Sequence, residues 1–413
     1  MNFISRLYHN THRLFTRFLF LPVFRNIYLP HKVKKIRKKD KIRFLFVLQI
    51  LPQWKTEQLY VAMLHHPRFE PILGIIPCLE YPGEEQNVIN YCKEKGYDYI
   101  LLSGDKTLTS QIDVDFVTHQ QPYKKQFHPK HYVTKNLKIP CVVIPYAMNS
   151  IVVERLIGLS LYLFCWKQYF ENESSCNERK PQHLLKGKNY AVTGLPMMDE
   201  LILPKENYPS PWPEDGRKRI IYAPHHTIAD LHSTWIAYST FLENGEFLQQ
   251  MRDKYKEEVY FVFKPHPMLY KKLCQVWGKE KTDEYYQSWE NAENSHIESG
   301  KYMGLFKHSH AMIHDCGSFT VEYLYTHNPV MYLLNDNHHE ETLSQYVKEA
   351  FNLHYKGHTH EEIEQFILDV IQGKDPLKNE REIFYNESLL PPHGKTACEN
   401  IINSILGIEE YSH

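Results

Sequence analysis

The sequence lacks an apolar run long enough to cross a membrane. Near its start the longest uninterrupted run is Phe18–Phe24, "FLFLPVF", whereas a spanning helix needs about 20 residues. No cleavage site made of small residues follows this run, as it would in a secretory signal. We therefore expect neither a transmembrane helix nor a secreted protein.

Paired cysteine motifs are also missing. The eight cysteines are scattered along the chain, and no two of them are separated by only two residues. This spacing excludes zinc knuckles and Cys-x-x-Cys redox motifs. Cys141 and Cys165 lie within apolar runs, where buried thiols are expected. The pattern indicates a reducing cytoplasm.

Net charge is almost absent, at −1 over 413 residues, so the composition gives no reason to expect nucleic acid as a partner. The charge is nevertheless uneven, because residues 1–43 contain twelve Lys and Arg but one acidic residue, Asp40. An amphipathic segment beside a polybasic run can lie on an anionic leaflet, with each basic residue contributing about 1 kcal/mol. We expect residues 1–41 to be a basic amphipathic arm that binds an anionic membrane surface. A basic arm that binds another protein, or nothing, is the alternative.

Strand-like runs alternate with helical patterns in both halves of the chain. The runs of the first half are residues 42–50, 70–77, 97–103, 114–120 and 139–147. Those of the second half are residues 219–226, 259–267, 310–318 and 329–336. A helical pattern covers residues 150–170. This alternation predicts the α/β class, with parallel sheets covered by helices on both faces.

The length predicts more than one domain, because 413 residues exceed what one hydrophobic core usually holds. The polar, turn-rich stretch 212–219 resembles a linker. After the arm we expect Rossmann-like domains at residues 42–204 and 205–376. A C-terminal helical segment at residues 377–413 is expected to pack back on the first domain.

Three polar loops follow strands in the second half: "APHHT" (223–227), "KPHPM" (264–268) and "HDCGSFT" (314–320). Ligands of open α/β sheets bind beyond the carboxyl ends of strands, so we expect these loops to form one site. Lys264 supplies a positive charge. His266, between two prolines, can donate to a phosphate oxygen or protonate a leaving group, since its pKa is ordinarily near neutrality. A solvated loop is the alternative.

The third loop has the groups of an anion pocket. Gly317 lets the backbone approach a ligand closely. The hydroxyls of Ser318 and Thr320 can also contribute to this pocket, and so can the first N–H groups of the following helix. An ordinary helix cap made by Ser318 or Thr320 is the alternative.

Taken together, these motifs resemble the CDP-glycerol glycerophosphotransferase family, whose members help build teichoic acids and related capsule polymers. The stretch "VTGLPMMDEL" (192–201) is similar to that family's Thr-Gly-x-Pro-x-x-Asp element, and "IIYAPHHT" to its Tyr-Ala-Pro strand end. The stretch "MIHDCGSFTVEYLYTHNPVMYL" is similar to its Asp-x-Ser-Ser…Asp…Lys-Pro stretch. The resemblance covers about residues 185–340.

The resemblance implies a GT-B architecture, in which an acceptor domain and a donor domain face each other across a cleft. It implies transfer of glycerol phosphate, or another polyol phosphate, from a CDP-linked donor to a hydroxyl of a lipid-linked or polymeric glycan. The enzyme would act as a peripheral protein at the cytoplasmic face of the bacterial cell membrane. A GT-B glycosyltransferase with a CMP- or UDP-sugar donor is one alternative, and a non-catalytic binder of anionic glycopolymer is another.

The resemblance also assigns roles. His266 and Asp315 are the expected catalytic residues, and His266 matches the histidine that contacts the donor diphosphate. The expected substrate-binding residues are Lys264, Ser318, Thr320, Glu322, Gly317, His225, His226, Thr193 and Gly194. No cofactor is expected. No metal is expected either, because the histidine-rich stretches "HHTIADLH" and "NDNHHEE" lack the compact spacing of a known site.

The sequence departs from the family pattern in both domains. His225 and His226 replace the usual Thr-Trp, and Gly317 replaces the first serine. The family's first domain carries a Trp-His-Gly element whose histidine is the suspected base, but the corresponding strand end at 142–150 has no histidine. The base therefore stays open, with His225 or His226 as substitutes. The acceptor and the oligomeric state stay open as well.

Overall fold

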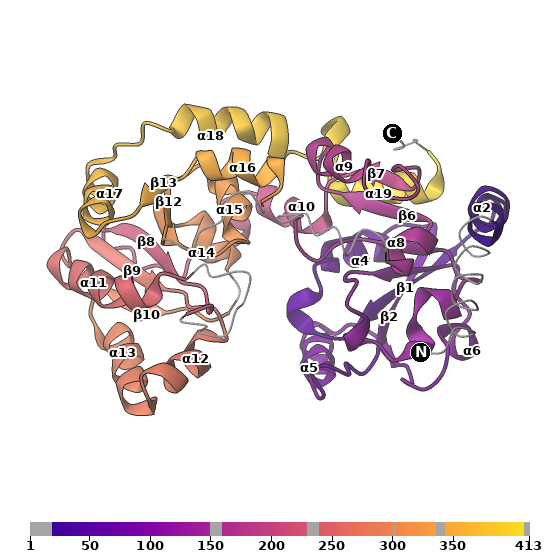
Figure 1. The fold of residues 1–413 in the computed structure, drawn as a ribbon, viewed down its shortest axis with the longest axis horizontal. Coiled ribbons are helices and arrows are strands. Elements are labelled where there is room, and N and C mark those ends of the chain that lie inside the picture. Colours follow the sequence, from indigo (N-terminus) through magenta and orange to yellow (C-terminus); the bar gives the residue numbers. More distant parts are fainter. Residues whose placement is uncertain (1–18, 149–158, 229–238, 301, 336–342, 409–413) are drawn as a thin grey trace, which may run out of the picture. The chain divides into compact units, whose positions relative to one another are not determined.

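The structure is a computed structural model that describes residues 19–148, 159–228, 239–300, 302–335 and 343–408. The chain forms two compact units (Figure 1). Unit 1 comprises Met1–Asp199 together with Pro391–His413, and unit 2 comprises Glu200–Leu390. The first boundary lies five residues before the one expected from the sequence, and the C-terminal residues belong to unit 1.

Unit 1 is built on a seven-stranded sheet in the order β3-β2-β1-β4-β5-β6-β7, with every pair parallel. The strands are β1 (Ile42–Leu48), β2 (Phe69–Ile75), β3 (Tyr99–Leu101), β4 (Phe116–His119), β5 (Cys141–Val143), β6 (Lys167–Phe170) and β7 (Tyr190–Val192). Strand β1 is buried on both faces, which explains its continuous apolar sequence. Of the helix expected over 150–170, residues 150–158 lie outside the described ranges. Of the described residues, Ser160–Phe164 form helix α8, but Lys167–Phe170 form strand β6, which corrects the expectation there.

The helices of unit 1 are short. They are α2 (Leu21–Val23), α3 (Leu29–Ile36), α4 (Glu57–Leu64), α5 (Glu85–Lys95), α6 (Leu108–Gln111), α8 (Ser160–Phe164), α9 (Glu173–Arg179) and α19 (Ala397–Leu406). Helix α10 (Pro196–Ile202) spans the boundary to unit 2. A π-helical turn, η2 (Phe24–Tyr28), joins α2 to α3.

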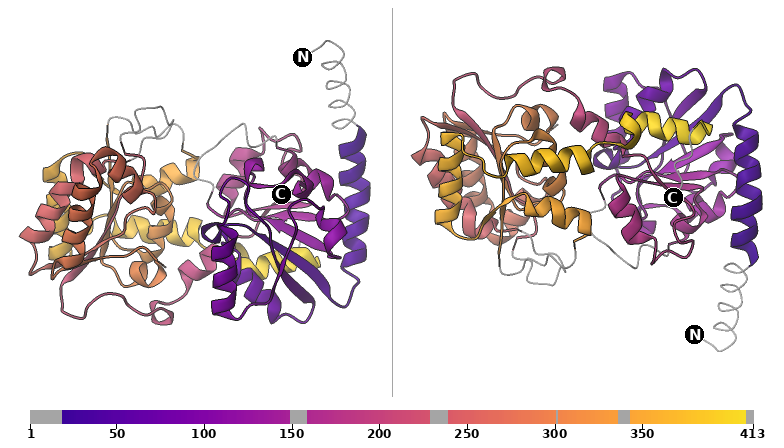
Figure 2. Two further views of the ribbon diagram at one scale, coloured as in Figure 1. Left: turned by 90° about the horizontal axis from the view of Figure 1, so that it is seen from below. Right: turned by 90° about the horizontal axis from the view of Figure 1, so that it is seen from above.

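The described part of the expected arm is a helix that packs on unit 1, along one side of it in Figure 2. Leu21, Phe24 and Leu29 are buried in the same apolar cluster as side chains of β4 and β5. The Arg25 guanidinium donates hydrogen bonds to the carbonyl oxygens of Cys165 and Trp166. Residues 21–36 are therefore part of unit 1 and not a separate arm, while residues 1–18 lie outside the described ranges.

The expected C-terminal segment is divided between the two units. Helix α18 (Lys378–Phe384) belongs to unit 2, whereas α19 packs on unit 1. The Asp199 carboxylate accepts hydrogen bonds from the backbone N–H groups of Ala397 (2.6 Å) and Cys398 (2.8 Å). These N–H groups have no partner within the helix, so Asp199 caps α19 from a distant part of the chain.

Unit 2 has a six-stranded parallel sheet in the order β10-β9-β8-β11-β12-β13. The strands are β8 (Lys218–Ala223), β9 (Val259–Phe263), β10 (Ser295–Ile297), β11 (Ala311–His314), β12 (Val330–Leu333) and β13 (Tyr355–Gly357). The helices besides α18 are α11 (Phe241–Lys254), α12 (Leu269–Val276), α13 (Lys279–Asn291), α14 (Met303–Lys307), α15 (Phe319–Glu322), α16 (Gln345–Asn352) and α17 (His360–Gln372). Aromatic residues of β8, β9 and α13, among them Tyr222, Phe263 and Trp289, form its core.

The strand order of unit 2 places the three polar loops side by side. Strand β8 pairs with β9 on one side and with β11 on the other. The chain therefore reverses its direction of winding next to β8, which makes this edge the topological switch point where α/β sheets bind ligands.

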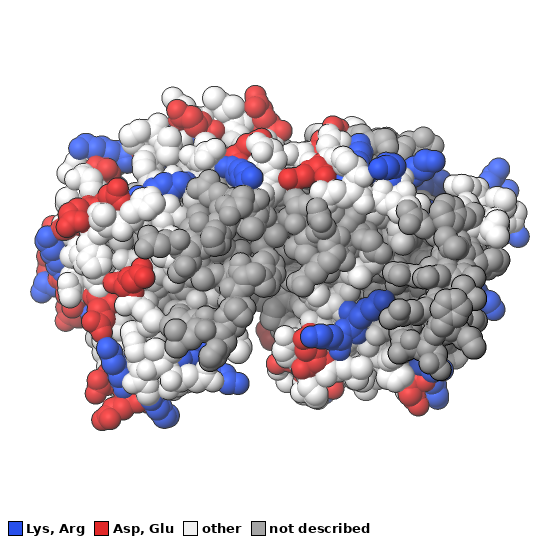
Figure 3. All heavy atoms as spheres, in the orientation of Figure 1, with Lys and Arg blue, Asp and Glu red and all other residues white. Residues whose placement is uncertain are grey.

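Charged side chains of both signs are interspersed on the face drawn in Figure 3. This agrees with the near-zero net charge of the sequence. Of the helices within the described ranges, none combines the length and hydrophobicity that crossing a bilayer requires.

Candidate functional site

Two of the polar loops bring three imidazole rings together. His225 and His226 follow β8, and His266 follows β9. Ring centroids lie 4.1 Å apart for His226 and His266, 5.0 Å for His225 and His266, and 4.3 Å for His225 and His226. The loops are also joined through the backbone, because the N–H of His266 donates to the carbonyl oxygen of Pro224 (3.1 Å). Each ring is partly exposed, so a ligand can reach this cluster.

Asp315 ties the third loop to this cluster. Its carboxylate accepts hydrogen bonds from the backbone N–H of His225 (2.6 Å) and from the N–H and hydroxyl of Thr240 (2.6 and 3.1 Å). The side chain is completely buried, and burial raises its pKa to about 6 against these hydrogen bonds. A buried carboxylate with these partners holds the loops in position, and the catalytic role expected for Asp315 stays a prediction.

The protonation of His266 follows from its surroundings. Burial, together with nearby His226 and Lys264, lowers its pKa to about 4. Its Nδ1 accepts a hydrogen bond from the backbone N–H of Met268 (3.1 Å). A neutral ring whose Nδ1 is an acceptor carries its proton on Nε2. In the free protein His266 is therefore a neutral hydrogen-bond donor, whereas the sequence suggested a group that titrates near neutrality.

The third loop presents a hydroxyl to solvent. Ser318 is exposed, and its Oγ lies 3.2 Å from the sulfur of buried Cys316. Ser318 makes no side-chain capping bond to α15, so its hydroxyl stays available to a ligand, and half-buried Gly317 lies beside it. Helix α15 has only four residues, and we therefore expect its N-terminus to contribute less to anion binding than the hydroxyl does.

Lys264, Tyr302 and Glu322 form a second set of polar side chains in unit 2. The Lys264 ammonium is 5.4 Å from the centre of the Tyr302 ring, and the Tyr302 hydroxyl donates to Glu322 Oε2 (2.7 Å). Lys264, Glu322 and Thr320 are all buried. Burial, followed by the Glu322 charge, raises the pKa of Tyr302. Sequence reasoning missed Tyr302, because no strand end or motif marks it.

Two of the expected substrate-binding residues have a structural role within the fold. Thr193 is fully buried in unit 1, and its carbonyl oxygen accepts a hydrogen bond from Asn400 of α19 (3.1 Å). Gly194 has a φ of +78°, and an added Cβ would lie 2.9 Å from the Cβ atoms of Pro391 and Ala397. Both residues are buried and contact the C-terminal segment, and their expected part in substrate binding stays a prediction.

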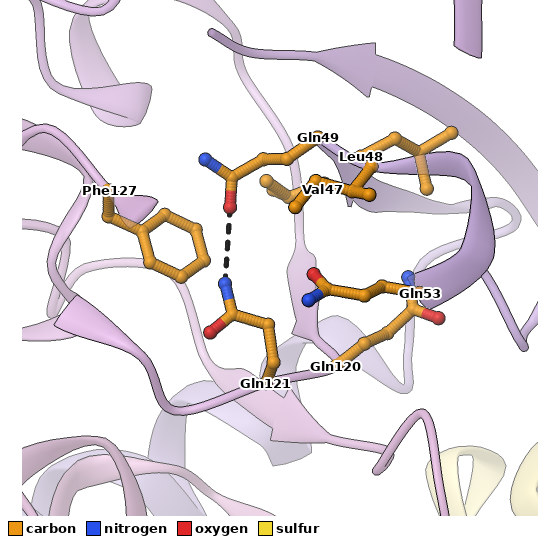
Figure 4. A pocket seen from close by; sticks show the side chains of 8 residues that line it. Val47, Leu48, Gln49, Gln53, Gln120, Gln121 and Phe127 are labelled. Carbon is orange, nitrogen blue, oxygen red and sulfur yellow. Dashed lines mark hydrogen bonds between the residues drawn. The ribbon is translucent and has the colours of Figure 1, made fainter. Parts of the chain in front are cut away.

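Unit 1 has a pocket of its own at the carboxyl ends of β1 and β4 (Figure 4). Its polar lining is made of the side chains of Gln49, Gln53, Gln120 and Gln121. Gln121 Nε2 donates to Gln49 Oε1 (3.2 Å), and Gln120 Oε1 accepts from the N–H of Lys55 (2.9 Å). The amides of Gln49, Gln120 and Gln121 are hydrogen-bonded within the protein. Amide groups do not act as bases, so the lining residues, all within the described ranges, supply no candidate for the missing base.

Each unit contains a parallel α/β sheet, and unit 2 places an ammonium group, imidazole rings and a hydroxyl at its switch point, where open α/β sheets bind ligands. The structure of Staphylococcus aureus MnaA with UDP has a TM-score of 0.56 at 14% identity, covering 88% of this chain and 96% of that chain. A putative UDP-N-acetylglucosamine 2-epimerase from Listeria monocytogenes has a TM-score of 0.57 at 16% identity, covering 90% and 98%. A variant of the wall teichoic acid polymerase TagF has a TM-score of 0.56 at 12% identity, covering 98% of each chain. These similarities confirm the expected α/β, GT-B-like fold.

The sequence itself matches one family. The model of the CDP-Glycerol:Poly(glycerophosphate) glycerophosphotransferase family matches residues 171–407, which is more than half of the chain. The protein belongs to this family of enzymes, which confirms the resemblance drawn from the motifs. No curated protein sequence matches the chain.

Proposed function

We propose that the protein transfers glycerol phosphate, or a similar polyol phosphate, from a CDP-linked donor to a hydroxyl of a lipid-linked or polymeric glycan. The product would be a cell-envelope or capsule polymer. The observation that carries this proposal is the convergence of His225, His226 and His266 with the Ser318 loop at the switch point of unit 2. Family membership supports the choice of donor.

The reaction is an in-line displacement at the phosphorus that bears the polyol. The acceptor oxygen forms a bond to this phosphorus, the bond to the bridging oxygen breaks, and CMP leaves with that oxygen. The acceptor hydroxyl gives up its proton, which passes to the phosphate of the departing CMP or to solvent. The Nε2–H of His266 and the hydroxyl of Ser318 donate to diphosphate oxygens, while Lys264 supplies positive charge. Because these groups are held in place before substrate arrives, they stabilise the developing charge without reorganising. No step in this scheme needs a metal.

Donor identity can be tested by ligand-induced stabilisation. A ligand that binds only the folded protein stabilises it by about 2.7 kcal/mol at 100 times its Kd. We expect CDP-glycerol, or CDP-ribitol, to raise the Tm of the full chain and to release CMP when an acceptor is added. UDP-sugars and CMP-sialic acid serve as matched controls. Turnover of a UDP- or CMP-sugar, with no response to CDP-polyols, would contradict the proposal and favour a glycosyltransferase.

We further propose that the protein works as a peripheral enzyme at the cytoplasmic face of a bacterial membrane. The N-terminal helix supports this, because the face opposite the buried one exposes Leu19, Val23 and Ile27 at four-residue spacing. Exposed Lys34 and Lys35 continue the same helix. An apolar face beside exposed basic residues suits the interface of an anionic bilayer.

Acidic substitutions on the exposed apolar face should weaken binding to anionic vesicles. Burying one Val or Ile side chain contributes about 1.5–3 kcal/mol, so the double substitution Val23→Glu and Ile27→Glu should lower partitioning into phosphatidylglycerol vesicles at least about 10-fold. Sedimentation with vesicles measures this. Val276→Glu changes an exposed apolar residue of unit 2 and should have little effect. Equal binding by all three proteins would show that this face does not contact the membrane.

A further inference from the structure

The three histidines of the site have a property that donor binding does not require. Each of His225, His226 and His266 offers one ring nitrogen, and these three nitrogens all lie within 4.8 Å of one another. The residues come from the ends of two adjacent strands, β8 and β9. Their closeness therefore arises from the fold, which is why no compact motif marks it in the sequence.

The loops that carry these rings are held by hydrogen bonds of their backbone N–H groups, which do not involve the ring nitrogens. The His225 backbone N–H is fixed by the Asp315 carboxylate (2.6 Å), and the His266 N–H by the carbonyl oxygen of Pro224 (3.1 Å). His225 Nδ1 lies 3.0 Å from the hydroxyl of Thr227. A hydrogen bond at one ring nitrogen of this kind orients the other for coordination.

Imidazole nitrogens select a particular class of cation. Neutral imidazole suits zinc, copper, nickel and iron, whereas magnesium and calcium prefer oxygen ligands. At the usual Zn–N distance of about 2.0–2.1 Å, tetrahedral ligands lie roughly 3.4 Å apart, which rotations of the three rings can reach.

We propose that His225, His226 and His266 form a site for a divalent transition-metal ion of the zinc type. Three protein ligands leave a fourth position open, as in catalytic zinc sites. Because the three rings are partly exposed, that position is accessible to water or to a diphosphate oxygen. The site binds the ion whether or not the protein turns over a CDP-linked donor.

Metal titration of the untagged full chain tests this proposal. After treatment with EDTA and its removal, the protein is titrated with ZnCl2 by calorimetry and with CoCl2 by visible absorption. We expect one ion per chain and the intense visible bands of tetrahedral Co2+. His226→Asn should weaken binding about 100-fold, whereas His358→Asn, which changes an exposed histidine of the same unit, should bind like the parent.

The outcomes separate this proposal from the proposed function. Thermal unfolding of each variant verifies that it is folded, and the Tm shift with CDP-glycerol is measured in EDTA. A CDP-glycerol shift without stoichiometric zinc binding overturns the metal site and leaves the transferase proposal intact. Zinc binding that His226→Asn weakens, without any response to CDP-polyols, supports the site and contradicts the donor. Zinc binding that His226→Asn leaves unchanged overturns the site.

Discussion

Replacing His266 by alanine is expected to lower kcat/KM for CMP release from CDP-glycerol by about 10²–10³-fold, the usual effect of losing one preorganised donor. The substitution removes the Nε2–H that the Met268 N–H bond keeps in place. Because the ring is partly exposed, its loss leaves no sealed cavity, and stability should change little. Initial rates of CMP release with purified protein measure the effect.

Two further variants make this result specific. His266→Gln keeps an amide N–H donor and should recover part of the lost activity. His296→Ala removes a half-buried histidine of the same sheet, whose Nδ1 is hydrogen-bonded to the Tyr260 hydroxyl (3.1 Å). This substitution should leave the rate almost unchanged. If His266→Ala retained full activity while folded, His266 would have no part in the transfer.

Replacing Asp315 by alanine is expected to lower the free energy of unfolding of unit 2 by about 1–4 kcal/mol at neutral pH. The backbone N–H groups of His225 and Thr240 would lose their acceptor in a buried place, at about 1–3 kcal/mol each. This loss is partly offset, because the substitution also removes a buried carboxylate whose pKa burial raises to about 6. Urea denaturation measures the change. The loop that carries His225 and His226 would also lose its anchor, so the CDP-glycerol Tm shift should fall in the fraction that still folds.

An exposed aspartate of the same unit provides the control. Asp283 contacts Lys279 and Tyr270 at the surface, and Asp283→Ala should change stability by no more than about 0.5 kcal/mol. Similar effects of the two substitutions would show that Asp315 does not anchor the loops.

The ends of β8, β9, β11 and β12 could be predicted from the sequence because each combines a buried apolar run with an abrupt polar loop. The three-residue edge strands β10 and β13 are not among the predicted strands. Strand β9 with Lys264 and His266 is the clearest case. Strand β6 could not be predicted, because its four residues, Lys-Gln-Tyr-Phe, follow directly on a helical pattern and are too few to show a period of their own. Its four residues are identified as a strand only by pairing with β5 and β7.

The roles of individual site residues depended on contacts that span the chain. Asp315 is bonded to residues 90 and 75 positions away, at His225 and Thr240. Asp199 caps a helix that begins 198 residues later, at Ala397. A motif shows which residue types recur together. It does not distinguish a carboxylate that contacts substrate from one that accepts hydrogen bonds from backbone N–H groups. For this reason the contacts that Asp315, Thr193 and Gly194 make within the fold could not be predicted from the motifs, and their roles toward substrate stay predictions.

The return of α19 to unit 1 has a consequence for folding during synthesis. A ribosome releases Met1–Asp199 long before Ala397–Leu406, so unit 1 waits without its last helix while the whole of unit 2 emerges. Unit 2, which is continuous in sequence, can complete its core first. During that interval Thr193, Gly194 and their apolar neighbours stay uncovered, and this period is when the nascent chain is most open to aggregation.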